Sequence, residues 1–450
     1  MSLQTEQELE SAYVMNTFAR KPVELVRGEG MAVFDDAGRE YLDFIGGIGA
    51  VSLGHCHPAL ADALADQAGK LVHVSNYYYV EHRGEVARML SDLLNAGPQD
   101  AAGEGGAGGA SPAGEEAADG GLLASPADPS AARGAWKTFF ANSGAEANEC
   151  AIKLARLHAR KRAAARAAAC GGDAQAAQDS AARLVVVLEG SFHGRTLATL
   201  AATAQPAKQE AFQPLPDGFA AVPQNDVAAL EALFARRGGE VCAVMVECVQ
   251  GESGVHPCTA EFLQAARRLT AEAGALLVCD EIQCGVYRCG TYPFGFQHFG
   301  IVPDVVTVAK GVASGMPMGA CCARAEVADA FEPGDHGSTF GGSCLAMAAA
   351  EATLCALFEE GIAERVERVG AYLRERLSTL PGVAEVRGLG LMVAADLAPE
   401  APAAPDVVAR GLDAGVLLNA TGPRTLRFLP PLVCEERHVD ALVEKLVGLL

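Results

Sequence analysis

The stretch Asp304-Val-Val-Thr-Val-Ala-Lys310-Gly-Val-Ala-Ser-Gly-Met-Pro-Met-Gly319 places a lysine at the end of an apolar run and before a glycine-rich turn. The run predicts a buried β-strand over residues 305–309, and Lys310 is the one lysine among eight that ends such a run. Burial lowers the pKa of a lysine, and a neutral amine in a dry pocket is a nucleophile toward carbonyl groups. The alternative is a side chain that extends from the strand end into solvent. The other strand ends must decide between the two.

Length and composition limit the classes of protein. The chain has 450 residues, half of them hydrophobic, so it can bury a large core and form two domains. Its net charge of −21 argues against a nucleic-acid or anionic-membrane partner. The acidic start, residues 1–10, does not resemble a signal peptide, and no uncharged apolar stretch has the ~18 residues of a membrane span. We therefore expect a cytoplasmic protein.

The 14 cysteines form no C-x-x-C pair and stand among apolar residues, which is typical of buried thiols. His55-Cys56-His57 is flanked by glycine and proline, which favours a turn into a helix over a set of metal ligands. No metal site is predicted.

Apolar runs alternate with helical patterns along most of the chain. This pattern predicts an α/β fold with a mostly parallel sheet that is covered on both faces, and ligands of such sheets bind beyond the carboxyl ends of the strands. The predicted strands are residues 137–141, 184–188, 241–246, 275–279 and 305–309.

Other segments depart from this alternation. Residues 23–44 predict a small antiparallel meander. Residues 98–134 are rich in glycine and acidic side chains and predict a low-complexity insertion, and residues 163–183 predict a second one after a helix over residues 149–160.

The residues that follow the predicted strands carry chemistry. Asn142-Ser-Gly-Ala-Glu-Ala-Asn148 opens a helix whose free N–H groups suit a phosphate, although a capping box of Ser143 and Glu146 explains the same pattern. Phe192 and Arg195 flank a glycine turn and could stack on a ring and bind a carboxylate, or form an ordinary loop. Two more strands run into Glu247 and Asp280, which need a cation if they are buried and none if they emerge into solvent.

Pyridoxal phosphate satisfies these features together. Its phosphate needs a helix N-terminus, its ring needs a stacking surface, its ring nitrogen needs a carboxylate, and its aldehyde needs an amine. Asp280 would keep the ring nitrogen protonated, and Lys310 would supply the amine for the Schiff base.

At this point the sequence resembles the class III (subgroup II) aminotransferases of pyridoxal-phosphate fold type I, and among them the acetylornithine/ornithine aminotransferases. The resemblance covers the chain apart from the two insertions. The segments that carry it are Gly54–Pro58, Asn142–Asn148, Phe192–Leu197, Glu247–Val255, Asp280–Gln283, Ala309–Gly311 and His336–Gly342. It implies a large domain with a seven-stranded-type sheet over residues 61–330, and a smaller α+β domain made from both termini, residues 1–60 and 331–450.

The resemblance also implies roles for single residues. Ser143, Gly144 and Ala145 would hold the cofactor phosphate, Phe192 would cover the ring, Asp280 would pair with the ring nitrogen, and Gln283 would lie near the ring hydroxyl. Thr339 would complete the phosphate site of a second subunit, which implies a homodimer, with Ser338 near the substrate. Lys310 would be both the Schiff-base amine and the base that moves the proton between substrate and cofactor carbons.

The implied reaction transfers the terminal amine of N2-acetyl-L-ornithine to 2-oxoglutarate and gives N-acetyl-L-glutamate 5-semialdehyde and L-glutamate, a step of arginine biosynthesis. Arg195 would bind the α-carboxylate of the donor. Arg427 resembles the second arginine of the family, and we expect Glu247 to neutralise it for the donor and release it for glutamate.

Several alternatives stay open. Ornithine, succinylornithine, acetyl-lysine and 4-aminobutyrate are rival donors. A metal-dependent enzyme with Glu247 and Asp280 as ligands, and a non-catalytic scaffold that binds through residues 98–134, are rivals of other classes. The chain departs from the family pattern at Cys248, at Ser343-Cys344 and at Cys284–Gly290, and we expect these departures to affect substrate preference more than reaction type.

Overall fold

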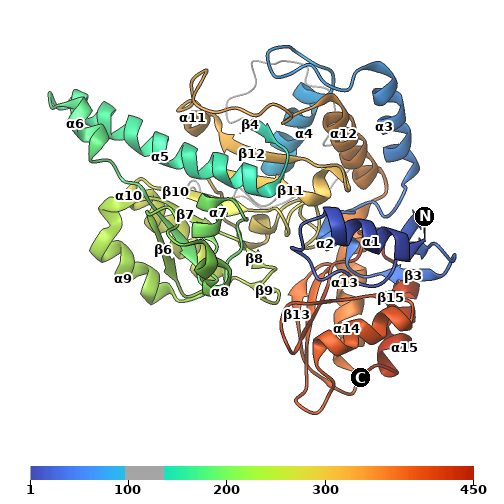
Figure 1. The fold of residues 1–450 in the computed structure, drawn as a ribbon. Coiled ribbons are helices and arrows are strands. Elements are labelled where there is room, and N and C mark those ends of the chain that lie inside the picture. The colour runs from blue at the N-terminus through green and yellow to red at the C-terminus, as the bar shows by residue number, and fades with distance from the viewer. Residues whose placement is uncertain (1, 97–135) are drawn as a thin grey trace, which may run out of the picture.

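The computed structural model describes residues 2–96 and 136–450 (Figure 1). The insertion predicted at residues 98–134 lies outside the described residues.

A seven-stranded sheet with the order β4-β12-β11-β10-β7-β5-β6 forms the centre of the molecule. Strand β12 is antiparallel to both of its neighbours, and the other strands run parallel to one another. The predicted α/β fold with a mostly parallel sheet is thus confirmed. The strands are β4 (Trp136–Ala141), β5 (Leu184–Leu188), β6 (Phe219–Val222), β7 (Val241–Val246), β10 (Leu276–Asp280), β11 (Val305–Ala309) and β12 (Gly319–Arg324).

The sequence predicted five of these strands and missed β6 and β12. Strand β12 reads Gly-Ala-Cys-Cys-Ala-Arg and contains no β-branched or aromatic residue, so its composition gives little β signal. Its pairing with β4 and β11 on either side stabilises it as a strand.

Both faces of the sheet are covered, which explains why its strands are continuously apolar. Leu276 and Val278 pack with residues of α5 (Gly144–Ala169) on one face. Leu277 and Cys279 belong to a second cluster on the other face, with α4 (Arg83–Asn95), α10 (Ala260–Ala273) and α12 (Cys344–Glu359).

Helix α5 is longer than predicted. The expected helix ended at Arg160 and gave way to an insertion at residues 163–183, but α5 continues to Ala169, and α6 (Ala174–Asp179) follows it. This part of the chain is rich in alanine and arginine, which have high helix propensity. The C-terminal part of α5 and the helix α6 project from the body of the molecule (Figure 1). Further helices of this part of the molecule are α3 (Pro58–Lys70), α7 (Leu197–Ala202), α8 (Pro206–Gln209), α9 (Val227–Arg237) and α11 (Ala325–Ala328).

Segments from both ends of the chain build the rest of the molecule. The predicted meander is present as β1 (Leu25–Glu29), β2 (Ala32–Asp35) and β3 (Glu40–Asp43), and β15 (Val416–Leu417) adds a parallel strand to it. Another sheet has the order β13-β14-β17-β16, with β13 (Val383–Leu389), β14 (Met392–Leu397), β17 (Thr425–Phe428) and β16 (Asn419–Ala420). The remaining elements are β8 (Val249–Gln250), β9 (His256–Pro257), α1 (Leu3–Tyr13), α2 (Gly46–Gly49), α13 (Ile362–Ser378), α14 (Ala404–Asp413) and α15 (Glu436–Val447).

Strands from the N-terminal and C-terminal parts share one sheet, and both termini lie in this smaller part of the molecule (Figure 1). The division at residues 60 and 330 stays a prediction. Within residues 2–96 and 136–450, no helix combines the length and the apolar character that crossing a bilayer requires.

Candidate active site

A cavity of about 370 Å³ lies at the carboxyl ends of the central strands. Its volume is in the range that is typical of small-molecule sites, ~300–1,000 Å³. Nine of the predicted site residues line it: Ser143, Gly144, Ala145, Phe192, Arg195, Glu247, Asp280, Gln283 and Lys310. Arg427 lies directly behind this lining, because it contacts Gln283.

Lys310 directly follows β11 and has a φ of 51°. Its side chain borders the cavity and is half-buried. This burial lowers the pKa of Lys310 below its ordinary value, and the negative charge of Glu252 offsets the lowering only in part. Ser52 braces the turn after the lysine by donating its hydroxyl to the carbonyl of Gly311 at 2.7 Å. The side chain therefore does not extend from the strand end into bulk solvent, which was the alternative.

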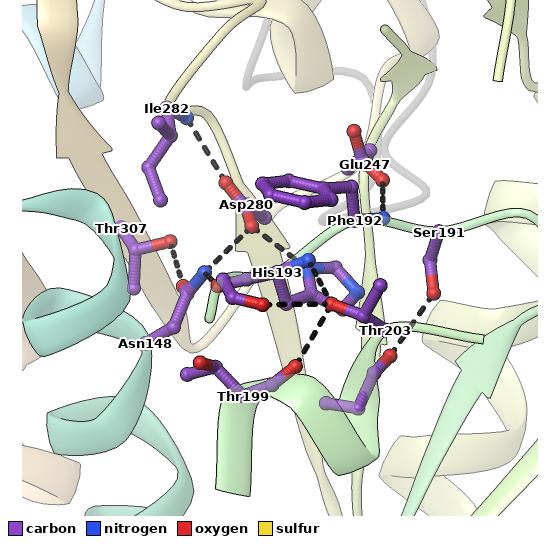
Figure 2. Close-up of polar contacts among 12 residues, drawn as sticks. Asn148, Ser191, Phe192, His193, Thr199, Thr203, Glu247, Asp280, Ile282 and Thr307 are labelled. Carbon is purple, nitrogen blue, oxygen red and sulfur yellow. Dashed lines mark hydrogen bonds and ion pairs between the residues drawn. The ribbon is translucent and has the colours of Figure 1, made fainter. Parts of the chain in front are cut away.

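Asp280 ends β10 and is held by a buried hydrogen-bond network (Figure 2). Its Oδ2 contacts Nδ1 of His193 at 2.7 Å and accepts a hydrogen bond from Nδ2 of Asn148 at 2.8 Å. Thr307 donates its hydroxyl to Oδ1 of Asn148 at 2.7 Å, which fixes the orientation of the amide. Among the described residues, the other oxygen, Oδ1, accepts one hydrogen bond, from the N–H of Ile282 at 3.1 Å, so it retains acceptor capacity for a ligand in the cavity that Asp280 lines.

His193 is fully enclosed beside Asp280. Burial lowers the pKa of His193, but its hydrogen bond to Asp280 and the charges of Asp280 and Glu247 outweigh burial, so the pKa is raised. The protonated imidazole would place a positive charge beside the Asp280 carboxylate.

Glu247 orients the loop that carries Phe192. One carboxylate oxygen accepts the N–H of Phe192 at 2.8 Å (Figure 2), and the other accepts the N–H of Gly251 at 3.3 Å. Burial raises the pKa of Glu247 to about 7. This carboxyl is thus occupied by backbone donors.

The start of α5 combines both interpretations of its sequence. Ser143 is the N-cap, and its hydroxyl accepts the N–H of Glu146 at 3.2 Å. The Glu146 carboxylate accepts the N–H of Asn142 at 2.7 Å, one residue earlier than a capping box requires. Gly144 and Ala145 line the cavity, and the first-turn N–H groups of a helix lack intrahelical acceptors. Capping therefore uses the N–H groups of Asn142 and Glu146, and the N–H groups of Gly144 and Ala145 stay available to an anion.

The predicted partner of Arg427 is wrong. Arg427 Nη1 donates to Oε1 of Glu252 at 2.7 Å and to Oε1 of Gln283 at 3.2 Å, and no contact joins it to Glu247 in the described part of the chain. The reason is the turn between β8 and β9, which brings Gly251 and Glu252 against β17. Arg427 Nη1 also donates to the carbonyl of Gly251 at 3.1 Å.

Ser338 and Thr339 do not line this cavity. The Ser338 hydroxyl accepts Nδ2 of Asn142 at 3.2 Å, whereas Thr339 is exposed and borders a small crevice beside residues 73–76. Their predicted roles across a subunit interface stay predictions.

The sequence reasoning missed His193, Asn148 and Glu252 as functional candidates, although each stands inside a quoted motif. A polar residue one to five positions from a recognised site residue was the available signal. It did not show which side chains turn toward the cavity.

Residues 14–109 and 124–450 match the family model described as Aminotransferase class-III. The chain belongs to the class-III aminotransferases. It is 40% identical to the acetylornithine aminotransferase of Caldanaerobacter subterraneus over 98% of each chain. It is 38% identical to the acetylornithine aminotransferase of Methanocaldococcus jannaschii over 99% of this chain and 98% of that one.

Solved structures agree. The ornithine aminotransferase of Toxoplasma gondii superposes with a TM-score of 0.82 at 28% identity, covering 100% of this chain and 94% of that chain. The acetylornithine aminotransferase of Elizabethkingia anophelis gives a TM-score of 0.78 at 30% identity, with 99% and 98% coverage. As a class-III aminotransferase, the chain is a pyridoxal-phosphate-dependent transaminase, and the metal-dependent and scaffold alternatives are set aside.

The residues present fit that cofactor. The cavity borders a helix N-terminus, an aromatic ring, the open side of the Asp280 carboxylate and the Lys310 amine. Two glycines are tightly packed around the start of α5, which lines the cavity. A Cβ at Gly144 would lie 2.6 Å from Cδ1 of Ile282, and one at Gly319 would lie 2.2 Å from the carbonyl oxygen of Ser143.

The positions at which this aminotransferase departs from the family pattern are not among the described residues that line the cavity. Cys248 is fully buried directly after Glu247, and Ser343 caps α12. Val286 and Tyr287 have φ values of 55° and 61°, a region that side chains rarely adopt. Arg288 stabilises this turn by donating to the carbonyl of Leu391 at 3.2 Å.

Proposed function

We propose that this aminotransferase transfers the terminal amino group of N2-acetyl-L-ornithine to 2-oxoglutarate, a step of arginine biosynthesis, and forms N-acetyl-L-glutamate 5-semialdehyde and L-glutamate. The observation that carries the proposal is the different state of two arginines at the cavity. Arg427 is neutralised by Glu252, whereas Arg195 has no ion pair with any carboxylate in the described residues. A donor with one carboxylate matches one free arginine. The names of the relatives support the same donor.

The second substrate has two carboxylates and needs both arginines. We propose that Glu252 releases Arg427 when glutamate or 2-oxoglutarate binds. Asn419 accepts Nε of Arg427 at 3.1 Å and would keep the guanidinium in place after Glu252 leaves. Burial raises the pKa of Glu252, but Arg427 outweighs burial and lowers it, so the carboxylate is ionised in the closed pair.

Pyridoxal phosphate supplies an aldehyde that condenses with amines and a ring that accepts electrons. We assign its phosphate to the backbone of Ser143, Gly144 and Ala145, its ring nitrogen to Asp280 and its ring face to Phe192. Gln283, which lines the cavity, would approach the ring hydroxyl. Lys310 would hold a proton on Nζ and move it between substrate and cofactor carbons, and its lowered pKa favours the neutral amine that this task requires.

A donor panel tests the proposed substrate. With 2-oxoglutarate as acceptor, we expect kcat/KM for N-acetylornithine to exceed the values for ornithine, succinylornithine, acetyl-lysine and 4-aminobutyrate by ~10-fold or more. Ornithine and 4-aminobutyrate lack the amide and its hydrogen bonds, succinylornithine adds a second carboxylate, and acetyl-lysine is longer by one methylene group. Glutamate formation is the measurement. A larger kcat/KM for any other donor would replace acetylornithine as the assignment.

Glu252→Gln tests the corrected partner of Arg427. The variant keeps the size of the side chain and removes its charge, so Arg427 becomes available to glutamate at all times. We expect the ratio of the glutamate to the acetylornithine half-reaction, as kcat/KM from cofactor absorbance in stopped flow, to rise ~10-fold. Glu247→Gln is the matched control and should leave this ratio within about 2-fold, since the Glu247 carboxylate accepts from backbone N–H groups and not from Arg427 in the part of the chain that the structure describes. A ratio that responds to Glu247→Gln and not to Glu252→Gln would restore the original assignment.

We also propose a homodimer in which Thr339 completes the phosphate site of the partner subunit and Ser338 lies near its substrate. The support is a run of exposed apolar side chains beside Thr339. Tyr77, Tyr78 and Phe340 are 94%, 65% and 61% exposed, and the rings of Phe340 and His73 lie 5.0 Å apart. Apolar groups gathered in this way are typical of protein interfaces. Sedimentation velocity should give a species of two chains; a monomer that is active at the same concentration would oppose the proposal.

We also propose that the enzyme is cytoplasmic. Cell fractionation should place the aminotransferase activity in the cytosolic fraction.

A further inference from the structure

Lys208 is a second cation beside the ring of Phe192. It lies on the short helix α8, and its Nζ is 5.6 Å from the centroid of that ring. The guanidinium carbon of Arg195 is also 5.6 Å from the same centroid. Phe192 and Arg195 both line the cavity, so Lys208 stands directly behind its wall.

Gln205 fixes the direction of the lysine side chain. The amide nitrogen of Gln205 donates to the carbonyls of Gly190 and Ser191 at 2.9 and 3.1 Å, which ties it to the loop that carries Phe192. The amide oxygen must then point away from these carbonyls, and it accepts a hydrogen bond from Nζ of Lys208. A lysine on a surface helix normally extends into water, whereas this one is held against the site.

Lys208 has a hydrogen-bond partner in Gln205 but no carboxylate partner among the described residues. Burial lowers the pKa of Lys208, and the charges that act on it come from Glu252, Arg195 and Arg427. Glu252 is already bound to Arg427. Among the described residues, neither Lys208 nor Arg195 has a carboxylate within the 4.0 Å of an ion pair. Two such cations next to one cavity favour an anionic ligand group between them.

We propose that Lys208 is a specificity-determining residue that, together with Arg195, binds the substrate carboxylate remote from the transferred amino group. This inference rests on the proposed function, in which Arg195 binds that carboxylate. The group would be the α-carboxylate of acetylornithine in one half-reaction and the γ-carboxylate of glutamate in the other. Both substrates would therefore use Lys208, whereas Arg427 would serve only glutamate.

The test is Lys208→Met, which keeps the aliphatic chain and removes the charge. The holoenzyme is titrated with acetylornithine, with glutamate and with n-butylamine, an amine without a carboxylate, and the cofactor absorbance is followed. We expect the half-saturating concentrations of acetylornithine and glutamate to rise about 5- to 30-fold, as for the loss of one charge-assisted hydrogen bond, with the limiting rates unchanged within about 2-fold. The value for n-butylamine should stay the same.

Two further variants complete the design. Lys208→Arg should recover most of the affinity, because it restores the charge. Lys70→Met removes a lysine on α3 that is 54% exposed and paired with Asp66, and it should change no titration. Equal losses for all three amines, or no loss for either carboxylate-bearing substrate, would overturn the proposal. If acetylornithine fails to react with the wild-type enzyme while glutamate shows the expected loss, the donor assignment falls and the role of Lys208 stands.

Discussion

Lys310→Ala is expected to abolish transamination, with kcat reduced at least ~10⁴-fold, and to remove the visible absorbance band that arises when the cofactor is bound to lysine. Lys310 is the amine at the end of β11 that borders the cavity, and its lowered pKa favours the reactive neutral form. The measurement is the absorbance spectrum of the purified variant together with a single-turnover rate.

The control for this variant is Lys153→Ala. Lys153 lies on α5 and donates to the carbonyl of Asp335 on the surface, away from the cavity. The Lys153→Ala variant should keep the wild-type absorbance spectrum. A band that persists in Lys310→Ala at the wild-type wavelength would refute the assignment of Lys310.

The same variant examines the proposed exchange of residues between subunits. A mixed dimer of Lys310→Ala and Thr339→Ala chains would contain one site with both defects and one site with neither. We expect about half of the wild-type activity per dimer to return on mixing, because Thr339 would act in trans. Recovery no greater than that of the Thr339→Ala homodimer would place Thr339 in the site of its own chain.

Asp280→Asn is expected to reduce kcat by ~10²–10⁴-fold while the protein still binds the cofactor. The substitution keeps the shape of the side chain and removes the charge that would stabilise a protonated ring nitrogen in the low-dielectric cavity. Pre-steady-state rates of each half-reaction measure the effect, and both should fall together. A rate within 10-fold of wild type would oppose the pairing of Asp280 with the ring.

His193→Gln separates the charge of Asp280 from its orientation. We expect kcat of His193→Gln to fall by about 10-fold, which is less than for Asp280→Asn, because Asn148 still donates to Asp280 at 2.8 Å. The raised pKa of His193 also predicts a pH dependence of stability. The ion pair between His193 and Asp280 contributes fully to the free energy of unfolding below the ordinary histidine pKa of 6.5, and this contribution is lost as pH rises through the raised value. The corresponding change of the free energy of unfolding with pH should therefore be absent in Asp280→Asn.

The sequence predicted those strands whose side chains are buried on both faces, because a continuous apolar run can be recognised without knowing which strands lie beside it. Strand β12 was not predicted because its small residues have little β propensity, and it forms a strand through its pairing with β4 and β11. Helix α5 was predicted too short because an alanine-rich surface segment carries no periodic apolar signal.

The sequence by itself determined the chemistry of the site. Lys310, Asp280 and the start of α5 each follow an apolar strand, and strand ends of a parallel sheet meet at one edge, so their convergence follows from order along the chain. The tertiary structure alone decided which carboxylate meets Arg427. Glu247 and Glu252 are five residues apart in one motif, and the choice depends on the β8–β9 turn lying against β17, a contact between segments 175 residues apart. It also placed Lys208 beside Phe192, since that proximity depends on how Gln205 ties α8 to the loop after β5. Contacts of this kind are set by packing between distant segments, which no local pattern records.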